Sequence, residues 1–459
     1  MEIKTKEIIQ NIEGKWSNKW IDKFTHFSID SRNTKNGSFF IALKGKRTDG
    51  HSFILDAVKR GAKGVVVQKK CQNIPSDIFV YYVNSTKDFL VSLGKFARKR
   101  VQGKIIGITG SAGKTTTKEM MNLVLKNKFC IASTKGNANT ELSIPLFLLN
   151  DVKGNEDFLV AEMGVQKKGD MDLLNAILQP NIAILLNIGD SHLEFLKNRE
   201  GVAKEKFKLI EFVKEKEGVT ILNGDSDLIW KFANKRNISA IYFGTEEEND
   251  VRGNIINSTE NTMNIKISYK NKSFFRQFSF SGMNFLYDIL ATLSAGISLG
   301  IPIDESLSIL KGFKPIEGRG RVIVLSRGIK IIDETYNSNP LSLKMSLMHL
   351  RGYKGNLIVI TGDMLELGEN AKMFHREAGA DIAKANPNLL ISIGQYADDT
   401  LIAAKEKGMK RGYAFSDMEK AKSFIEKLEI PSNSVIFVKG SRGIKMEKIV
   451  EILKERFGR

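Results

Sequence analysis

The chain has 459 residues, a length that predicts about three domains. Its 42% hydrophobic and 27% charged residues are the balance of a globular protein and exclude wholesale disorder. Two cysteines cannot build a disulfide framework, and no uncharged apolar stretch reaches the about 20 residues that a membrane-spanning helix needs. The N-terminal sequence MEIKTKEIIQ lacks the apolar core of a signal peptide. We therefore expect a cytoplasmic protein without membrane insertion.

The chain is strongly basic, with 70 lysine and arginine residues, 52 acidic residues and a net charge of +18. Nucleic-acid binding is one explanation of this charge. The basic residues are spread along the sequence, however, without a basic arm or interleaved aromatic residues. A polyanionic substrate explains the charge equally well, so charge alone leaves both alternatives open.

Residues 1–84 have the pattern of a small α/β domain. The apolar run 39–43 predicts a strand, residues 53–60 predict a helix, and residues 64–67 begin another strand. The polar segment Asp30 to Arg32 stands at a strand end, where the ligand-binding loops of α/β folds gather. Such segments are also common turn formers, so these residues by themselves leave ligand binding and turn formation open.

The stretch from Lys104 to Thr117, KIIGITGSAGKTTT, is the most informative one in the chain. Its isoleucines predict the end of a buried parallel strand, and a glycine-rich loop and a helix follow. In such a unit the backbone N–H groups and the helix dipole face a phosphate, Lys114 reaches its terminal groups, and Thr115 can hold Mg²⁺. Ile108 stands where the strict P-loop pattern has glycine. The candidate phosphate ligands are Gly110, Ser111, Ala112, Gly113, Lys114, Thr115 and Thr116.

Two further apolar runs end at residues that suit a metal or a phosphate. Residues 158–161 end at Glu162, and a carboxylate at the end of a strand beside the P-loop strand is where P-loop enzymes place a metal-ordering acid. Residues 182–186 form the next run, and His192, one of five histidines, follows it. A solvated strand-end glutamate and a structural histidine are the alternatives.

The remaining pattern continues the α/β organisation. Residues 201–212, GVAKEKFKLIEF, predict a helix whose lysines would normally face solvent. Alternation of polar and apolar residues over 251–281 predicts antiparallel strands. Strands at 357–361 and 435–438 alternate with helices and precede glycine-rich loops, which predicts a second open α/β sheet.

Together, these motifs resemble those of the Mur ligase family. The P-loop form TGxxGKTT, the N-terminal DSR and DGH segments, and the C-terminal stretches DETYNSNP, TGDMLELGE (followed by His375) and VKGSRGIKMEKIV match family signatures over nearly the whole chain. The resemblance implies three α/β domains: a UDP-substrate domain at 1–84, a central ATP-binding P-loop domain at 85–314, and a Rossmann-like acceptor domain at 315–459. We expect a monomer.

Within the family, the C-terminal stretches look like those of the branch that joins D-alanyl-D-alanine to UDP-N-acetylmuramoyl-tripeptide (UDP-MurNAc-tripeptide) in peptidoglycan precursor synthesis. That reaction converts ATP to ADP and phosphate through an acyl phosphate. The resemblance assigns Ser31, Arg32, Asn337, Asn339 and Asp363 to the substrates, and adds Asn284, Arg319 and Glu334 to the ATP ligands. Arg321 is a neighbouring alternative to Arg319.

The resemblance further implies two Mg²⁺ ions and the catalytic residues Lys114, His192 and Lys206. The implied metal ligands are Thr115 and Glu162 for one ion, and His192 and Lys206 for the other. In the family the lysine at the position of Lys206 is carbamylated, which turns an ammonium into the oxygen ligand that Mg²⁺ prefers. Lys204 and Lys208 are the neighbouring alternatives.

The chain departs from the family pattern at three positions. In the family's GxHNxxNxLAA helix, which contacts adenine, Met283 stands for the histidine and Asp288 for the second asparagine, whereas Asn284 matches. Glu334 replaces the second aspartate of DDSYNAN and is one methylene longer. We expect the nucleotide contacts at these positions to differ from those of the family.

Two other functions are compatible with parts of the sequence. A related ligation is one, but the branch that adds the third amino acid carries an Asp-Asn-Pro-Arg segment that this chain lacks, and folylpolyglutamate ligases lack the DSR domain. A basic P-loop protein that binds nucleic acid is the other. We expect no nucleic-acid partner, and dependence on an amine acceptor separates the two classes.

Overall fold

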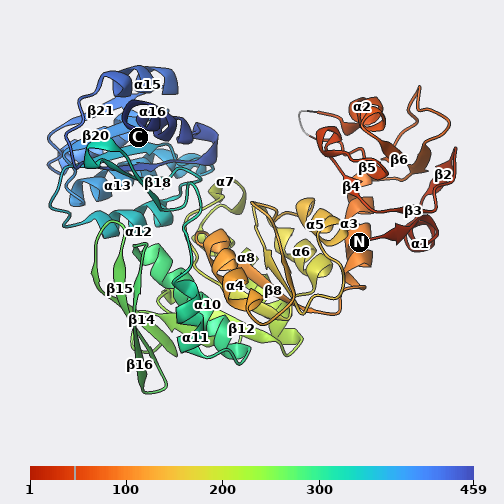
Figure 1. The fold of residues 1–459 in the computed structure, drawn as a ribbon, viewed down its shortest axis with the longest axis horizontal. Coiled ribbons are helices and arrows are strands. Elements are labelled where there is room, and N and C mark those ends of the chain that lie inside the picture. The colour runs from red at the N-terminus through yellow and green to blue at the C-terminus, as the bar shows by residue number, and fades with distance from the viewer. Residues whose placement is uncertain (46–47, 459) are drawn as a thin grey trace. The chain divides into compact units, whose positions relative to one another are not determined.

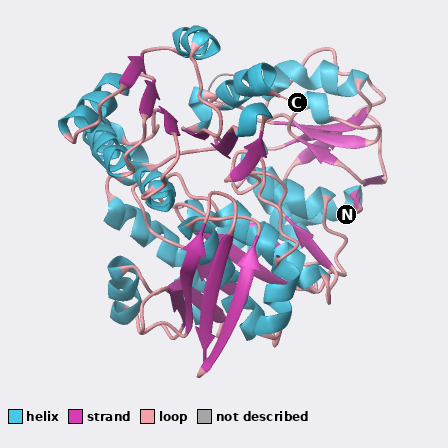
Figure 2. Ribbon diagram, turned by 60° about the vertical axis from the view of Figure 1, so that its left-hand side comes forward, coloured by secondary structure: helices cyan, strands magenta, loops and turns pink. Residues whose placement is uncertain are grey.

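The computed structural model describes residues 1–45 and 48–458 and contains three large β-sheets covered by helices (Figures 1 and 2). The chain divides into two compact units. The first comprises residues 1–107, 125–165 and 169–182, and the second comprises residues 108–124, 166–168 and the chain from Ala183 onward. Within the described ranges, no helix is long and apolar enough to cross a bilayer.

The first unit contains a five-stranded sheet of order β2-β7-β6-β5-β4, in which only the edge strand β2 is antiparallel to its neighbour. The strands of this sheet are β2 (Lys15–Ser17), β4 (Phe27–Ser28), β5 (Ser38–Ile41), β6 (Ala62–Val67) and β7 (Phe79–Tyr82), and β1 (Ile3–Lys4) and β3 (Lys23–Phe24) pair antiparallel as a separate two-stranded sheet. Among its described residues, the unit also contains five α-helices. Its helices are α1 (Thr5–Asn11), α2 (Ile54–Lys59), α3 (Thr86–Arg98), α5 (Ser143–Asn150) and α6 (Asp170–Leu178), of which α3 lies against α5 and α6. Helix α3 begins at Thr86 because the Ser85 side chain accepts a hydrogen bond from the Asp88 N–H.

The P-loop strand β8 (Lys104–Thr109) belongs to a nine-stranded sheet of order β16-β15-β14-β13-β12-β11-β8-β10-β9. Its further strands up to Gly244 are β9 (Ile131–Ser133), β10 (Phe158–Glu162), β11 (Ile182–Leu185), β12 (Val219–Asn223) and β13 (Ile241–Gly244). The strands expected within 104–109 and at 158–161 and 182–186 are therefore confirmed.

The predicted antiparallel segment over 251–281 is also confirmed. It forms β14 (Val251–Ser258), β15 (Met263–Tyr269) and β16 (Lys272–Phe278), which pair antiparallel with one another. Strand β14 in addition pairs parallel with β13, so the segment extends the sheet rather than standing apart from it. Helices of this part are α4 (Lys114–Lys126), α7 (Leu193–Leu196), α8 (Arg199–Glu215), α9 (Asp227–Lys235), α10 (Met283–Ser298) and α11 (Ile303–Leu310).

The C-terminal part forms the predicted second open sheet, of order β17-β18-β22-β19-β20-β21, parallel except between β17 and β18. Its strands are β17 (Arg321–Val324), β18 (Lys330–Glu334), β19 (Leu357–Gly362), β20 (Leu389–Ile393), β21 (Gly412–Phe415) and β22 (Val435–Lys439). Its helices are α12 (Pro340–Leu350), α13 (Ala371–Lys384), α14 (Ala397–Glu406), α15 (Met418–Lys427) and α16 (Glu447–Phe457). The α/β class and the three-domain organisation are confirmed, and the domain boundaries remain predictions.

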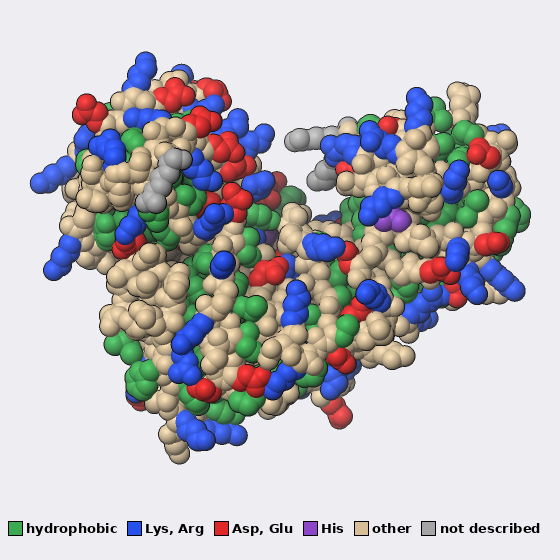
Figure 3. All heavy atoms as spheres, viewed as in Figure 1, with side chains coloured by type: hydrophobic (Ala, Val, Ile, Leu, Met, Phe, Trp, Pro, Cys, Tyr) green, Lys and Arg blue, Asp and Glu red, His purple; other side chains and the backbone are tan. Residues whose placement is uncertain are grey.

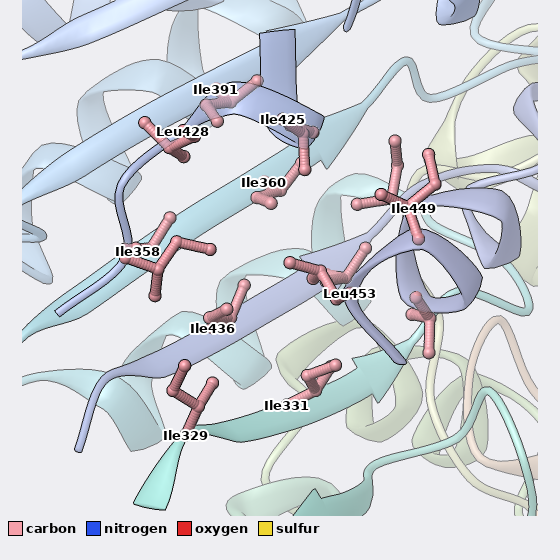
Figure 4. Close-up of a cluster of buried hydrophobic side chains, with 14 of the residues drawn as sticks. Ile329, Ile331, Ile358, Ile360, Ile391, Ile425, Leu428, Ile436, Ile449 and Leu453 are labelled. Atoms are coloured by element: carbon pink, nitrogen blue, oxygen red, sulfur yellow. The ribbon is translucent and has the colours of Figure 1, made fainter. Parts of the chain in front are cut away.

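The core of this C-terminal sheet is a layer of isoleucine and leucine side chains (Figure 4). Ile436 lies on the central strand β22, in register with Ile331 on one side and Ile358 on the other. Ile449 and Leu453 of α16 belong to the same buried cluster. Parallel strands covered by helices are buried on both faces, which is why these strands read as unbroken apolar runs.

We expect Ile436→Ala to destabilise the C-terminal sheet by about 2–5 kcal/mol, because it removes a side chain of 0% exposure and leaves a cavity. Hydrogen exchange of the β18, β19 and β22 amides measures this loss, since a chain of several domains need not unfold in one step. The matched control is Ile402→Ala on α14, whose side chain is 48% exposed. Equal protection of the strand amides in the two variants would contradict the assignment of this core.

Candidate nucleotide and metal site

The glycine-rich loop takes the conformation that the sequence predicts. Gly113 has a φ of 87°, and a Cβ atom there would lie 2.5 Å from Asp288 Oδ1, so both backbone conformation and space require glycine. Helix α4 begins at the next residue. The first hydrogen bond of the helix is donated by the Thr117 N–H to Gly113 O at 2.9 Å. The loop therefore leads directly into a helix N-terminus, the arrangement that binds phosphate.

Asn187 holds this loop, and the sequence reasoning did not identify it. Its Oδ1 accepts the Ala112 N–H at 2.9 Å, its Nδ2 donates to Ala112 O at 3.2 Å, and its backbone oxygen accepts the Ser111 N–H at 3.2 Å. Asn187 follows strand β11, the sheet neighbour of β8. Its place just after a strand was the available signal, because strand ends of one sheet meet at one edge.

Two lysine side chains converge on the first glycine of the loop. Lys114 Nζ lies 2.6 Å and Lys206 Nζ lies 3.1 Å from the same atom, Gly110 O. Lys206 is 1% exposed, and burial, followed by the charge of Lys114, lowers its pKa well below the usual range.

The neighbours of Lys206 on α8 differ from it. Lys204 is exposed, and Lys208 forms an ion pair with Glu205 at 2.8 Å. Lys206 instead shares the buried face of the helix with Ala203, Phe207 and Ile210. The geometry therefore favours Lys206 over its two sequence alternatives.

His192 lies just after β11 in a left-handed backbone conformation, with a φ of 55°. Its Nδ1 is 2.5 Å from Glu366 Oε2, and this hydrogen bond lowers the pKa of Glu366. Glu366 is a second functional candidate that the sequence reasoning missed, because 174 positions separate the two residues.

The other two predicted metal ligands fall in different units. Glu162 ends β10 as expected, is buried, and donates its N–H to Thr134 Oγ1 at 3.2 Å in the first unit. Thr115 is buried in the first turn of α4 in the second unit. Over residues 1–45 and 48–458, His, Cys, Asp and Glu side chains form no group of three that could hold a metal ion.

Two of the predicted ATP ligands belong to one polar network. Asn284 Nδ2 donates to Ser346 Oγ at 3.3 Å, and Ser346 Oγ donates to Glu334 Oε2 at 2.6 Å. Lys439 Nζ donates to the same Glu334 oxygen at 2.8 Å. Glu334 thus already has two protein partners, and Ser346 and Lys439 were not predicted.

Of the two arginines considered for nucleotide contact, Arg319 lies over an aromatic ring. Its guanidinium carbon lies 3.8 Å from the centre of the Tyr336 ring, whereas Arg321 is exposed. Stacking on an aromatic face fixes the plane of a guanidinium group. The geometry therefore favours Arg319.

The predicted acceptor-side residues play different parts. Asn339 caps α12 by accepting the Ser342 N–H at 2.9 Å and donates to Ser111 O of the P-loop at 3.1 Å. Asn337 is exposed, and its Oδ1 accepts the Arg442 N–H at 3.4 Å.

The carboxylate of Asp363 is engaged by backbone rather than available on the surface. It is 3% exposed and accepts the N–H groups of Gln395 at 2.6 Å and Tyr396 at 3.2 Å. Burial raises its pKa. In this structure Asp363 holds the turn after β20, because a strand-end carboxylate satisfies the free N–H groups of the neighbouring loop.

The residues predicted for the UDP end lie in the first unit. Arg32 is exposed and binds Asp30 through two nitrogens, at 3.0 and 2.7 Å. This hydrogen bonding lowers the pKa of Asp30. Ser31 is buried, and its side chain lowers the pKa of Asp56 in the first turn of α2. Both side chains thus sit at the strand-end loop that the sequence indicated.

A cavity of about 520 Å³ adjoins the P-loop through Asn187. The side chains of Met283 and Met345 line it, together with Asp225 and Tyr287. The Tyr287 hydroxyl donates to Asp225 Oδ2 at 2.7 Å, and burial, followed by this hydrogen bond, raises the pKa of Tyr287. The cavity lining therefore combines methionine side chains with a hydrogen-bonded tyrosine–aspartate pair.

Comparison with known proteins identifies the family. Three family models match: "Mur ligase family, catalytic domain" over residues 23–94, "Mur ligase middle domain" over 108–296, and "Mur ligase, glutamate ligase domain" over 318–442. A UDP-N-acetylmuramoyl-tripeptide--D-alanyl-D-alanine ligase from Bacillus subtilis (strain 168) is 31% identical over 455 residues, covering 98% of each chain. The chain belongs to the Mur ligase family.

Further Mur ligases are similar in sequence and structure. The ligase of the same name from Buchnera aphidicola subsp. Baizongia pistaciae is 32% identical over 93% of this chain and 92% of its own length. A crystal structure of MurF from Acinetobacter baumannii superimposes with a TM-score of 0.88, at 27% identity and 99% coverage of both chains. MurF from Thermotoga maritima, solved in complex with ADP, gives a TM-score of 0.82 at 30% identity, covering 94% of this chain and 97% of its own.

The adenine helix of the Mur ligases needs a corrected register in this chain. Counting GxHNxxNxLAA from Gly282 places the histidine at Asn284 and the first asparagine at Phe285, one residue later than the assignment made from the sequence. Phe285 is buried, with its ring 4.9 Å from that of Phe280. Asp288, at the second asparagine of the motif, is buried and accepts the hydroxyl of Thr117 on the P-loop helix at 2.8 Å.

Asp288 makes a testable contribution to stability. Burial raises its pKa to about 8, so the folded protein keeps this proton up to that pH, whereas the unfolded chain releases it near a pKa of 3.8. Its contribution to the free energy of unfolding is therefore fully present below about pH 4 and is lost as the pH rises to about 8. Asp288→Asn keeps the acceptor for Thr117 and has no such charge, so we expect it to be more stable than wild type at pH 9, by on the order of a few kcal/mol.

Urea unfolding followed by Trp230 fluorescence, in a background with Trp16→Phe and Trp20→Phe, measures this difference at pH 5 and pH 9. The control Asp398→Asn neutralises an exposed carboxylate on α14. A stability difference for Asp288→Asn that does not grow between the two pH values would contradict the prediction.

Proposed function

We propose that this chain is an ATP-dependent ligase that joins D-alanyl-D-alanine to UDP-MurNAc-tripeptide in peptidoglycan precursor synthesis. Support comes from relatives bearing that name that match over nearly their whole length. The observation that carries the proposal is the convergence of Lys114 and Lys206 on the P-loop.

The chemistry follows from the poor reactivity of a carboxylate as an acyl donor. A terminal carboxylate oxygen of the tripeptide attacks the γ-phosphorus of ATP, ADP leaves, and an acyl phosphate forms. The amine of D-alanyl-D-alanine then attacks the acyl carbon, the C–O bond to phosphate breaks, and the amine loses a proton as the amide forms. Both steps bring anions together, so cationic groups that screen them supply most of the rate. Lys114 is the protein cation at the P-loop.

The chemistry of Lys206 suits one of the two Mg²⁺ ions expected from the family. A neutral amine reacts with CO₂, and burial beside Lys114 lowers the pKa of Lys206 in the direction that such a reaction needs. Thr115 and Glu162 would hold one ion, and His192 with carbamylated Lys206 the other. Bound there, the ions would neutralise the phosphate and carboxylate oxygens. Within residues 1–45 and 48–458, no three acidic, cysteine or histidine side chains form a metal-binding group. Carbamylated Lys206 would therefore supply an oxygen ligand that these side chains do not.

The remaining contacts are assigned by the same proposal. Ser31 and Arg32 would bind the UDP end of the substrate, and Asn337 and Asn339 would face the reacting end, whereas Asp363 would act by shaping its loop. A monomeric cytoplasmic enzyme without a nucleic-acid partner stays our prediction. On the face shown in Figure 3, lysine and arginine side chains are interspersed with acidic and neutral ones rather than gathered in one patch.

The test of this function is phosphate release from ATP in the presence of UDP-MurNAc-tripeptide, with and without D-alanyl-D-alanine. We expect release to continue only when the dipeptide is present, because the acyl phosphate is otherwise held without an amine to accept the acyl group. Lys114→Ala should reduce this rate by at least about 100-fold, as removal of a group that stabilises transition-state charge does. The control Lys126→Ala removes an exposed lysine from the other end of α4. Release that ignores the dipeptide would refute the assignment.

Carbamylation of Lys206 can be tested without turnover. After addition of ¹³C-bicarbonate we expect a carbamate carbon signal in the ¹³C NMR spectrum that disappears in Lys206→Ala, because only this lysine combines burial with a lowered pKa on its helix. Lys204→Ala, which removes an exposed lysine two residues away, is the control and should keep the signal. Identical spectra of the wild type and Lys206→Ala would exclude the modification.

A further inference from the structure

The loop Met364–Gly368 of the C-terminal part carries one carboxylate, Glu366, to the loop that holds His192. Besides the side-chain contact of 2.5 Å, the Glu194 N–H points to Glu366 O at 3.4 Å. A Cβ atom on Gly368 would lie 3.6 Å from Glu194 Cα. The two loops therefore meet through backbone as well as side chains, and both belong to the second unit.

The Glu366 loop is anchored on both sides by contacts within the C-terminal sheet. The Met364 N–H donates to His375 Nε2 at 2.9 Å, and the Leu365 N–H donates to Ser441 Oγ at 2.9 Å. Met364 and Leu367 are buried on either side of the exposed glutamate. The position of Glu366 is thus determined by β19, α13 and the loop after β22, and not by His192 itself.

The backbone of both partners is in a sparsely populated region. His192 has a φ of 55° and Glu366 a φ of 62°. Histidine is among the residues enriched in the left-handed region, whereas glutamate is not. Such conformations cost free energy and persist where the surrounding structure holds them, often at functional sites. Here they aim the imidazole and the carboxylate at each other.

This contact fixes which imidazole nitrogen carries the proton. An ionised carboxylate can only accept, so Nδ1 donates, and in a neutral ring Nε2 then keeps its lone pair. Histidines that bind metals commonly donate their other N–H to a carboxylate, which sets both tautomer and ring orientation. We propose that Glu366 is a positioning residue that presents His192 Nε2 to a divalent cation, so that the acceptor-side domain helps to build the metal site. This inference rests on the metal role proposed for His192.

The first readout is the tautomer of His192, seen in the ¹⁵N–¹H long-range spectrum of protein with labelled histidine. The five histidines give few signals, and His192→Asn assigns the relevant one. We expect the Nδ1–H tautomer in the wild type, its loss in Glu366→Ala, and its retention in Glu366→Gln, whose amide oxygen can still accept. Glu369→Ala removes an exposed carboxylate from the adjoining turn and should leave the spectrum unchanged.

The second readout is binding of Mn²⁺ in the presence of ADP and bicarbonate, measured by electron paramagnetic resonance. His192→Asn identifies the bound Mn²⁺ that depends on His192, because this signal is lost in that variant. We expect the affinity for this Mn²⁺ to fall about 10–100-fold in Glu366→Ala and by less in Glu366→Gln. Unchanged His192 signals or unchanged Mn²⁺ affinity in Glu366→Ala, with the class still lost in His192→Asn, would overturn the role of Glu366 alone. Full Mn²⁺ binding by His192→Asn would instead remove the metal role of His192, and the inference with it.

Discussion

Two lysine amines on one carbonyl oxygen are the arrangement on which the rest of the site depends. Lys114 and Lys206 both lie within hydrogen-bonding distance of Gly110 O. Two ammonium groups this close repel each other, and a fully buried one also lacks stabilisation by solvent. Both effects lower the pKa of the buried lysine. Burial and the charge of Lys114 therefore lower the pKa of Lys206, while Lys114 lies at the loop where a phosphate would bind.

The site is built from loops that follow several strands. Residues of the C-terminal part form hydrogen bonds to residues of the P-loop and of α10. Asn339 donates to the P-loop at Ser111, and Glu334 and Asn284 share the hydroxyl of Ser346. In open α/β sheets ligands bind beyond the carboxyl ends of the strands, so polar loops from two sheets can face one ligand there. These contacts are individually modest, at about 0.5–1.5 kcal/mol for a typical hydrogen bond. Their value lies in fixing where the P-loop and its partners stand.

What the sequence could predict followed from whether the signal was local. The P-loop was predictable because strand, glycines, lysine and helix start are contiguous, and every one of them is where the pattern placed it. Glu162 was predictable in position because a strand end is also a local feature. Asn187 and Glu366 were not, since their contacts depend on which strands are neighbours and which loops meet. The register of the adenine helix was predicted one residue too early because this chain has Asn284 in place of the motif's histidine and Phe285 in place of its first asparagine. Asn284 was therefore matched to the motif's asparagine.

Asp288 shows why a departure from a family pattern can be tolerated in a buried place. A protonated carboxyl group has the size of a carboxamide and offers one donor and an acceptor, where asparagine offers two donors and an acceptor. In this chain Asp288 Oδ1 accepts the hydrogen bond of the Thr117 hydroxyl. The same oxygen would lie 2.5 Å from a Cβ atom on Gly113. Burial supplies the condition that keeps the group neutral, since it raises the pKa to about 8. The replacement therefore preserves the packing on the P-loop at neutral pH without placing a negative charge beside the loop that must bind phosphate.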